Sequence, residues 1–540
     1  MKDILLKHKL NSCYVIASLV ITLAMIMMSK VNFTTIYGTV KENYIKTFNI
    51  VHTIIIGCLL FWVVYVSFKI FDFILSKYCN RINSKKKWKN FNLALVISII
   101  LIVFWLPYYL SYYPGGIYSD TFNAIWQIQT HNYSNHHPLL YTFLIKIVIK
   151  IATILGEDLN FALGLFLAAQ MMAMGATIIY FGIWMNKHNV RKGTLNICLV
   201  YLICFPLIPL NAISIWKDTP FAIAVLLYAL SSIDLFVDKN ALRENYKLLI
   251  RHCVCILGVT FTRNNGIYIV IASTLLYIIF LNGDYINKTY KKLVFSFSVI
   301  GIIITLLIQG PVYSLMGISK SEVEESLGIP IQQIARVVAL DGNINPKQKV
   351  QINKIVPIDE IKEEYRPCIV DPIKWNEKFD GEYLEEHKLE FINLWGALMV
   401  QNFDIYVEAY MLATAGFWCI NVASPDAYIQ NYVWPNGYGV TQHDYFEDFF
   451  GISFQNLVNP KKYISSAWFF WIFIISMALS IKRGGMKVIC LYAPILFIWV
   501  TIMIATPLAI SMRYIFGMVF GLPLAFVLPQ FFENYSCNNV

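Results

Sequence analysis

Charged residues are scarce in this chain of 540 residues: they make up 14% of it, while 57% is hydrophobic. A soluble domain carries about a quarter charged residues. The shortage excludes an ordinary soluble protein of this length, because so large an apolar excess must form segments that cross a bilayer. The net charge of +10 does not indicate nucleic acid, since Lys and Arg gather in the cytoplasmic loops of any multi-pass membrane protein.

Two common sequence signals are also missing. The 11 cysteines are an odd number without a Cys-x-x-Cys pair, which indicates small buried residues rather than a metal site or a disulfide framework. The first apolar run follows Lys2, Lys7 and Lys9 but contains no small-x-small cleavage site. We therefore expect a retained first helix rather than a removed signal peptide.

Apolar windows of spanning length are abundant, and hydropathy predicts about twelve transmembrane helices. They fall at 12–29, 48–75, 92–111, 159–184, 195–213, 219–237, 246–262, 267–282, 293–309, 463–481, 488–507 and 512–532. The predicted fold class is thus an all-α polytopic membrane protein.

Basic clusters predict the side of the membrane that each loop faces. They lie at the N-terminus and at 77–89, 186–192, 238–247, 287–292 and 482–487. These positions fall on alternate loops, and Lys and Arg mark the cytoplasmic side. The pattern predicts a multi-pass protein of the plasma membrane with both termini in the cytoplasm.

The segment 139–156 needs a separate decision, because Lys146 and Lys150 lie in the middle of its apolar run. Treating it as a span would reverse every later loop and would bury two lysines at high cost. We therefore expect an amphipathic helix on the outer surface. The loop 113–138 and the acidic segment 310–462 then face outward. Two apolar pieces of that segment, 391–400 and 405–422, are predicted as further helices on the membrane surface.

Asp120 is the first candidate for chemistry, as the only acid in a loop that has no Lys or Arg. It follows a Pro-Gly-Gly turn and begins a predicted short helix, 121–129. An Asp at a helix start is also an ordinary N-cap, so position alone leaves capping and catalysis equally open. As a catalytic group, it would be a general base on an acceptor hydroxyl.

The same loop ends in Asn-His-His-Pro, with His136 and His137 adjacent. Neighbouring histidines rarely reach one metal ion, and no suitable third ligand is spaced near them. No cofactor is therefore predicted, and a divalent metal stays open without being indicated. Contact with a sugar hydroxyl or a phosphate and a plain packing role both stay open for these side chains.

Further polar clusters interrupt the apolar helices on the predicted outer face. They comprise Lys217, Asp218, Arg263, Asn264, Arg513 and Tyr514. Anchoring at the membrane surface explains each cluster alone. Together they suit a phosphate or pyrophosphate, which Arg binds through paired hydrogen bonds. Arg336, one turn after Gln332 in the segment 328–338, belongs either to a lid or acceptor groove or to a solvated helix.

These features resemble the GT-C class of integral-membrane glycosyltransferases, which have an acid-bearing external loop, a surface helix after it, many spans and a late external domain. More closely, the motifs YPGGIYSD, SNHHPLLYT, WKDTPF, TRNNGIY, IPIQQIARVV and MRYIFGMV resemble those of an uncharacterised family of Gram-positive polytopic membrane proteins. This resemblance covers about residues 100–340 and the C-terminal helices.

The resemblance implies a division of the chain into four parts. They are a two-helix addition at 1–91, a seven-helix GT-C-like module at 92–309 with a catalytic loop at 112–158, an extracytoplasmic segment at 310–462, and three C-terminal spans at 463–540. The acidic loop follows the third helix here rather than the first. Asp120 also lacks the neighbouring second carboxylate of several GT-C families, which weakens the case for a divalent metal.

The activity implied is transfer of a sugar, with inversion, from a polyprenyl-phosphate donor to an external glycan or cell-envelope acceptor. Asp120 matches the acid of the first external loop, and Arg263 and Arg513 match positions that hold a lipid phosphate. Tyr113, His136 and His137 belong to the substrate site in this interpretation. Membrane lipid is a further expected partner, and nucleic acid is not.

Two other classes of function stay open. A transporter or flippase of a lipid-linked glycan would need ionisable groups deep in the membrane, for which Arg251 and His252 are the best candidates. A scaffold whose external segment binds cell-wall polymer would leave the clustered polar turns unexplained.

Overall fold

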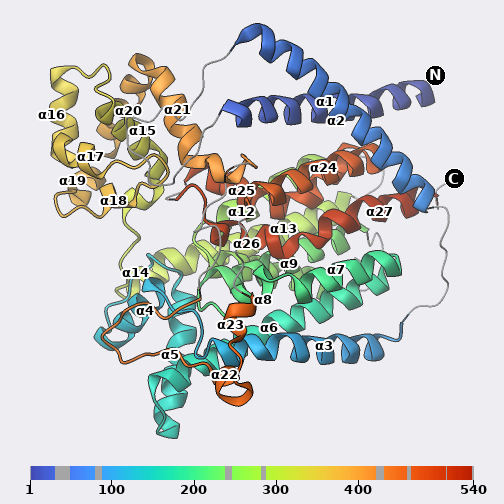
Figure 1. Ribbon diagram of the computed structural model, residues 1–540, viewed down its shortest axis with the longest axis horizontal. Helices are drawn as coiled ribbons and strands as arrows, with labels where there is room; N and C mark the ends of the chain where they lie inside the picture. Colours follow the sequence, from blue (N-terminus) through green and yellow to red (C-terminus); the bar gives the residue numbers. More distant parts are fainter. Residues whose placement is uncertain are drawn as a thin grey trace.

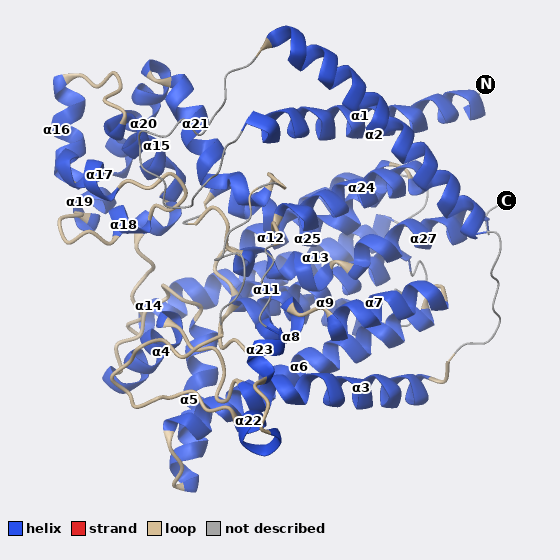
Figure 2. Ribbon diagram, viewed as in Figure 1, coloured by secondary structure: helices blue, strands red, loops and turns tan. Residues whose placement is uncertain are grey.

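The computed structural model describes residues 2–30, 49–79, 88–237, 246–280, 288–420, 422, 431–458, 464–505 and 508–537. Helices dominate these residues, and the only β-structure among them consists of isolated bridges (Figure 2). The all-helical class predicted from hydropathy is confirmed.

Nine stretches of the described residues are long and apolar enough to cross a membrane. They lie in α1 (Lys2–Lys30), α2 (Ile50–Cys79), α3 (Asn90–Ser111), α6 (Leu159–Lys187), α9 (Asp218–Val237), α13 (Lys288–Leu307) with its continuation, α24 (Ala467–Gly484), α25 (Ile489–Ile504) and Met512–Phe531. The chain is therefore a multi-pass membrane protein. The count of twelve stays a prediction, because the other three predicted spans form shorter helices. These are α7 (Lys192–Cys204), α11 (Tyr246–Thr262) and α12 (Gly266–Phe280).

The predicted span 195–213 is interrupted at Pro206. α7 ends at Cys204, and α8 (Leu207–Ala212) begins after the proline. Phe205 has ψ 117, the extended conformation favoured before a proline, which also lacks an N–H to continue the helix. The break brings the chain after α8 beside the loop at Gly116, whose N–H donates to Ile213 O at 2.9 Å.

The loop after α3 forms α4 (Ser119–Thr130) and α5 (Leu139–Leu155). In Figure 1, α5 runs across the direction of α3, at the end of the bundle opposite both labelled chain ends. One face of α5 is buried, including Tyr141 and Ile145, while Ile147 and Ile154 on the other face are exposed. This amphipathic helix lies across the end of the bundle, as the sequence predicts for a surface helix.

The two N-terminal helices pack against each other, and α1 also contacts α24. Asp72 of α2 pairs with Lys482 and, at 2.8 Å, with Arg483 of α24. Both labelled chain ends lie at one end of the bundle (Figure 1). Parts of the basic clusters, at 80–87, 238–245 and 287, fall outside the described residues.

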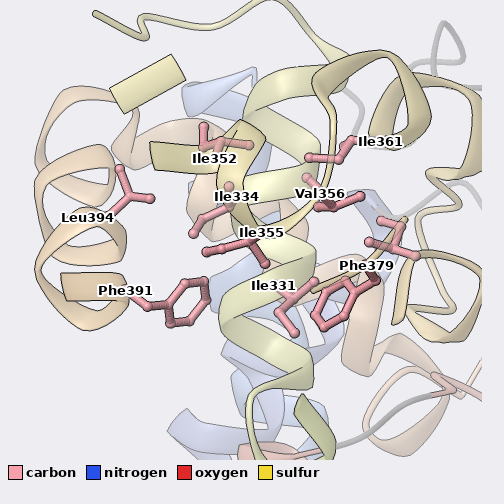
Figure 3. Close-up of a pocket in the computed structure, with 11 residues that line it drawn as sticks. Ile331, Ile334, Ile352, Ile355, Val356, Ile361, Phe379, Phe391 and Leu394 are labelled. Carbon is pink, nitrogen blue, oxygen red and sulfur yellow. The ribbon is translucent and has the colours of Figure 1, made fainter. Parts of the chain in front are cut away.

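An outer helical unit has a core of its own, separate from the core of the bundle. It contains α15 (Gly328–Ala339), α16 (Pro346–Ile355), α17 (Ile358–Glu364), α18 (Asp371–Lys374), α19 (Gly381–Glu386), α20 (Lys388–Gln401) and α21 (Phe403–Thr414). Figure 3 shows this core, where apolar side chains enclose a cavity of only about 20 Å³. So small a void is a packing gap between the helices rather than a ligand site.

The predicted surface helices 391–400 and 405–422 correspond to α20 and α21. Phe391, Leu394 and Leu398 of α20 are buried in the core of the outer unit, so this apolar face packs on protein rather than on a bilayer. α21 ends at Thr414 and is followed by a short turn at Ala415–Phe417. The chain then returns to the bundle, where α22 (Tyr445–Phe450) and α23 (Phe454–Val458) pack against α3.

Candidate functional site

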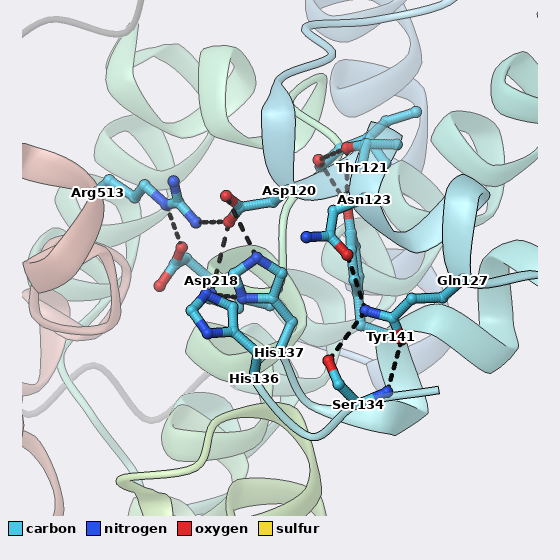
Figure 4. A network of polar contacts seen from close by, with 12 residues as sticks. Asp120, Thr121, Asn123, Gln127, Ser134, His136, His137, Tyr141, Asp218 and Arg513 are labelled. Atoms are coloured by element: carbon cyan, nitrogen blue, oxygen red, sulfur yellow. Dashed lines mark hydrogen bonds and ion pairs between the residues drawn. The ribbon is translucent and has the colours of Figure 1, made fainter. Parts of the chain in front are cut away.

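Five charged side chains from four separate segments meet through ion pairs beside α4, and Figure 4 labels Asp120, Asp218 and Arg513 among them. We call them the charged network. They are Asp120 on α4, Lys217 and Asp218 at the start of α9, Arg263 before α12, and Arg513 in the turn Met512–Ile515. All five had been singled out in the sequence, where nothing indicated which of them would pair.

The local backbone explains how Asp120 enters the network. Gly115 has φ 120, and a Cβ at this position would lie 2.8 Å from Ile213 O, so the tight turn requires glycine. α4 begins at Ser119 with Tyr118 at its N-cap position, and no side chain caps it. The capping role left open for Asp120 is therefore wrong. Its carboxylate pairs with Arg513 instead.

Arg513 links the two carboxylates of the network. Its Nη2 contacts Asp120, and its Nε donates to Asp218 Oδ2 at 2.6 Å. Its guanidinium also lies 4.5 Å from the centre of the Trp216 ring. Arg513 thus binds the two carboxylates through different nitrogens while its flat face packs on the Trp216 ring. Only Arg can do this, because Lys has a single nitrogen and no planar group. Asp218 therefore lies across the guanidinium from Asp120, as a second carboxylate of the network.

Arg263 completes the other side of the network. Its Nη1 lies 2.8 Å from Asp218 Oδ1 and donates to Tyr514 O at 3.3 Å. The neighbouring Asn264 donates from Nδ2 to Asn135 O at 2.8 Å. The turn between α11 and α12 is thereby attached to the loop that carries the two histidines.

His137 lies between Lys217 and Asp120. Lys217 Nζ is 2.6 Å from His137 Nδ1 and 3.5 Å from Asp120 Oδ2, while His137 Nε2 is 3.6 Å from Asp120 Oδ1. A lysine ammonium can only donate, so Nδ1 accepts and the ring hydrogen sits on Nε2, toward Asp120. Burial, followed by the charge of Lys217, lowers the pKa of His137 to about 3. The imidazole is therefore neutral at pH 7.

The electrostatics of the network leave a surplus of positive charge. Burial alone would raise the pKa of Asp120, but the charges of Arg513 and Lys217 outweigh burial and hold that pKa well below the usual carboxyl range. Three cations, Lys217, Arg263 and Arg513, then face two carboxylates. A buried site with one excess positive charge is suited to an anion.

His136 has a different environment from its neighbour. Its Nδ1 lies 2.7 Å from Glu322 Oε2, in the linker that leads from the bundle to the outer unit. In the same linker, Ser319 N donates to Tyr133 O at 3.1 Å and Ser319 O accepts from Asn135 N at 2.8 Å. The histidine loop is thus attached directly to the start of the outer unit.

Two predicted site residues lie apart from the charged network. Arg336 is 2% exposed in the core of the outer unit, where its Nη2 pairs with Glu408 Oε2 at 2.6 Å and its Nη1 donates to the Tyr365 hydroxyl. Neither the solvated helix nor the acceptor groove considered for Arg336 agrees with this burial. Tyr113 packs its ring against Tyr109 and Gly164, where the C-terminal end of α3 meets the N-terminal part of α6.

Sequence reasoning missed the uncharged residues that support the network. Thr121 and Tyr141 both donate to Ile215 O, at 2.8 and 2.9 Å, which fixes α4 and α5 against the segment before α9. Asn431 accepts from Ser214 Oγ at 2.6 Å and from the Tyr118 hydroxyl at 3.2 Å. The sequence marked this supporting segment before α9 only through Trp216, which is next to Lys217 in the WKD motif.

An apolar groove of about 490 Å³ lies between α3 and α6. Its wall includes Trp105, Tyr109 and Met172. Tyr109 donates to Gly164 O at 3.3 Å, and Tyr113 packs on the same glycine. The groove therefore runs along the bundle toward the loop that carries Asp120.

Within the described ranges, no three His, Cys, Asp or Glu side chains come together as a metal site. A family model described as a family of unknown function (DUF6020) matches residues 4–535, and the chain belongs to this family. No curated protein and no solved structure matches the chain. Membership of this family assigns no activity.

Proposed function

We propose that this protein is an integral-membrane glycosyltransferase of the GT-C type in the bacterial plasma membrane, with both termini in the cytoplasm. It would move a sugar from a polyprenyl-phosphate donor to a glycan or other cell-envelope acceptor outside. The observation that supports this best is the buried charged network, in which Asp120 and Asp218 share Arg513 beside Lys217 and Arg263. One site thereby combines a proton acceptor with cations for a phosphate.

The cations act on the donor in this proposal. A lipid phosphate at the network would take up the surplus positive charge and would compete with the carboxylates for Arg513. As the bond between the sugar and the phosphate breaks, Arg263 and Arg513 would stabilise the charge that grows on the departing phosphate. Loss of one such group commonly costs about 3–4 kcal/mol of transition-state stabilisation.

Asp120 acts on the acceptor. While Arg513 and Lys217 lie beside it, Asp120 is ionised but weakly basic. A phosphate that draws Arg513 away would raise the pKa of Asp120 and strengthen it as a base. The acceptor oxygen then attacks the anomeric carbon, its proton passes to Asp120, and the phosphate leaves with the electron pair. Attack opposite the phosphate inverts the anomeric centre.

The groove between α3 and α6 supports a lipid-linked donor. Its walls are apolar side chains on two helices of spanning length, so a prenyl chain could lie in it at the level of the bilayer. The groove leads toward the loop that carries Asp120, which would bring the phosphate at the end of the chain near the network.

Transport of a lipid-linked glycan is the weaker alternative. Its best candidates were Arg251 and His252. Arg251 pairs with Asp234 and donates to the Tyr180 hydroxyl at 2.9 Å, and His252 Nδ1 lies 2.9 Å from Ser231 Oγ. These partners account for both side chains as packing contacts between helices.

The test is the glycan composition of the cell envelope in a deletion strain that carries wild-type, Asp120→Asn or Asp158→Asn protein at matched expression. Asp158 is the exposed N-cap of α6, and Asn caps equally well, so Asp158→Asn should restore the wild-type glycans. Asp120→Asn should lose one sugar decoration, because an amide cannot accept the proton. Full rescue by Asp120→Asn would remove the proposed base and favour transport or scaffolding.

A further inference from the structure

A strip of aromatic rings leads from the protein surface to the charged network. Trp434 and Tyr432 form its outer end, with exposed fractions of 45% and 39%. Their ring centres are 6.1 Å apart and their planes differ by 22°. Tyr118 follows, 5.8 Å from Tyr432, and Trp216 lies 4.4 Å from Tyr118. The Trp216 ring is the one against which Arg513 packs.

Backbone hydrogen bonds hold the outer end of this aromatic strip in place. Ile117 N donates to Tyr432 O at 3.1 Å, and Trp434 N donates to Ile117 O at 2.8 Å. Asn436 donates from Nδ2 to the carbonyl oxygens of Trp434 and Val440, both at 3.0 Å. Two large exposed rings are thus fixed on an ordered backbone, in contact with the segment that leads directly into α4.

The inner end of the strip has an unused hydrogen-bond donor. Trp216 is 8% exposed, and its Nε1 is buried without a hydrogen-bond partner in the described part of the chain. A buried indole N–H usually finds a partner. An oxygen atom of a ligand beside Arg513 would supply one.

We propose that the aromatic strip binds carbohydrate and is the path by which a glycan acceptor reaches Asp120. A sugar ring presents a face of C–H groups that packs on the electron-rich face of Trp or Tyr, while its hydroxyls accept from groups such as an indole N–H. The role as acceptor path rests on the proposed function; the binding of carbohydrate does not.

Trp and Tyr also gather at the surface of membranes, and this is the main rival explanation for Trp434 and Tyr432. Anchoring in the membrane surface accounts for exposed rings. It gives no reason for the strip to continue inward through Tyr118 to the buried Trp216 and Arg513. The continuous path therefore favours a ligand that extends from the surface to the network.

The test uses full-length protein in phosphatidylcholine nanodiscs on an array of bacterial and plant oligosaccharides. Trp434→Ala and Tyr432→Ala should each weaken the binding of the glycan held by the wild type by about tenfold or more. Trp434→Tyr should retain most of the binding. Trp375→Ala is the matched control, because Trp375 is 73% exposed in the outer unit, and it should bind like the wild type.

Two results would overturn the proposal. One is a wild type that binds no glycan on the array, or that binds one equally well after Trp434→Ala. The other concerns the fluorescence of Trp434, taken as the difference between the wild type and Trp434→Phe. If brominated phosphatidylcholine quenches this fluorescence and added glycan does not change it, the ring lies in lipid.

Asp120→Asn separates this proposal from the proposed function. It should lose sugar transfer, and in that variant glycan binding should still depend on Trp434. If it keeps transfer while binding still depends on Trp434, the proposed general base is wrong and the carbohydrate site stands.

Discussion

Arg513 serves two carboxylates through different nitrogens of one guanidinium, with Nε toward Asp218 and Nη2 toward Asp120. Asp218 is buried and the Asp120 side chain is only 15% exposed, and a buried charge that loses its partner is strongly destabilising. The same side chain is therefore needed for the folded site and, in the proposed reaction, for holding a phosphate. Replacing Arg513 with Lys keeps the positive charge and removes the guanidinium geometry. This substitution therefore tests whether the site needs the geometry as well as the charge.

Arg513→Lys is expected to slow sugar transfer by about a hundredfold or more, since one ammonium cannot occupy both positions. The unpartnered carboxylate should also reduce the free energy of unfolding by up to about 3 kcal/mol. Transfer rates and melting temperatures of the purified protein would measure both effects. Arg483→Lys, which changes the pair with Asp72, is the control and should lower stability alone. Wild-type transfer by Arg513→Lys would contradict the role given to the guanidinium.

His137 should make stability depend on pH. Its pKa is about 3 in the folded protein and about 6.5 in an unfolded chain. As pH falls from about 6.5 toward 3, the unfolded state binds a proton that the folded state does not, so stability drops by up to about 1.4 kcal/mol per pH unit.

His137→Gln should therefore lose less thermal stability than the wild type between about pH 7.5 and about pH 5. Melting curves at the two pH values measure the difference. His131→Asn is the control and should lose as much stability as the wild type. His131 is exposed and has φ 57, a backbone conformation that Asn tolerates. An equal loss in His137→Gln and the wild type would contradict a buried neutral imidazole.

The helix α5 positions the site although it contributes no charge to it. Its buried face carries Tyr141, which bonds to Thr121 of α4 and to Ile215 O. Lys146 donates to the Tyr133 hydroxyl at 2.7 Å, while Lys150 is exposed. A helix lying on the surface accommodates both lysines without burying them in lipid.

A cysteine at Lys150 should therefore react with a membrane-impermeant maleimide added to intact cells. A cysteine at Lys187, at the opposite end of α6, should react only after permeabilisation. The comparison is made against the wild type, whose own cysteines set the background. Protection of Lys150→Cys in intact cells, with labelling after permeabilisation, would place α5 on the other side and reverse the predicted topology.

Two hydrophobic cores are joined beside the site. The core of the bundle includes the helices that carry the charged network, and the outer unit has a core of its own. The linker between them pairs with the histidine loop through Ser319 and Glu322.

The predicted orientation places the outer unit outside and both chain ends in the cytoplasm. Alkaline phosphatase inserted in the exposed turn at Asp341–Asn343 should be active, because this enzyme folds outside the cytoplasm. The same enzyme fused at the C-terminus should be inactive, whereas a fluorescent protein fused there should be bright. The opposite pattern would place the charged network on the cytoplasmic side, where a polyprenyl-phosphate donor of the proposed kind would not be used.

Several features followed from the sequence because they depend on local properties of the chain. Apolar run length located the nine helices of spanning length among the described residues, since the cost of placing a segment in a bilayer is nearly a sum over its residues. Proline and glycine also act locally, although the break at Pro206 was overlooked. Asp120, Lys217, Asp218, Arg263 and Arg513 were recognised because polar residues at the ends of apolar helices need a reason to be there.

Which of these residues are partners depends on how the helices pack. Asp120 and Arg513 are 393 residues apart in the sequence, and helix packing rather than any local pattern brings them together. The same packing buries Arg336 in another core and aligns Trp434 with Trp216 through Tyr118. Ion pairs and ring contacts act over a few ångströms between surfaces that only the fold places side by side, so their pairing could not be derived from residue order.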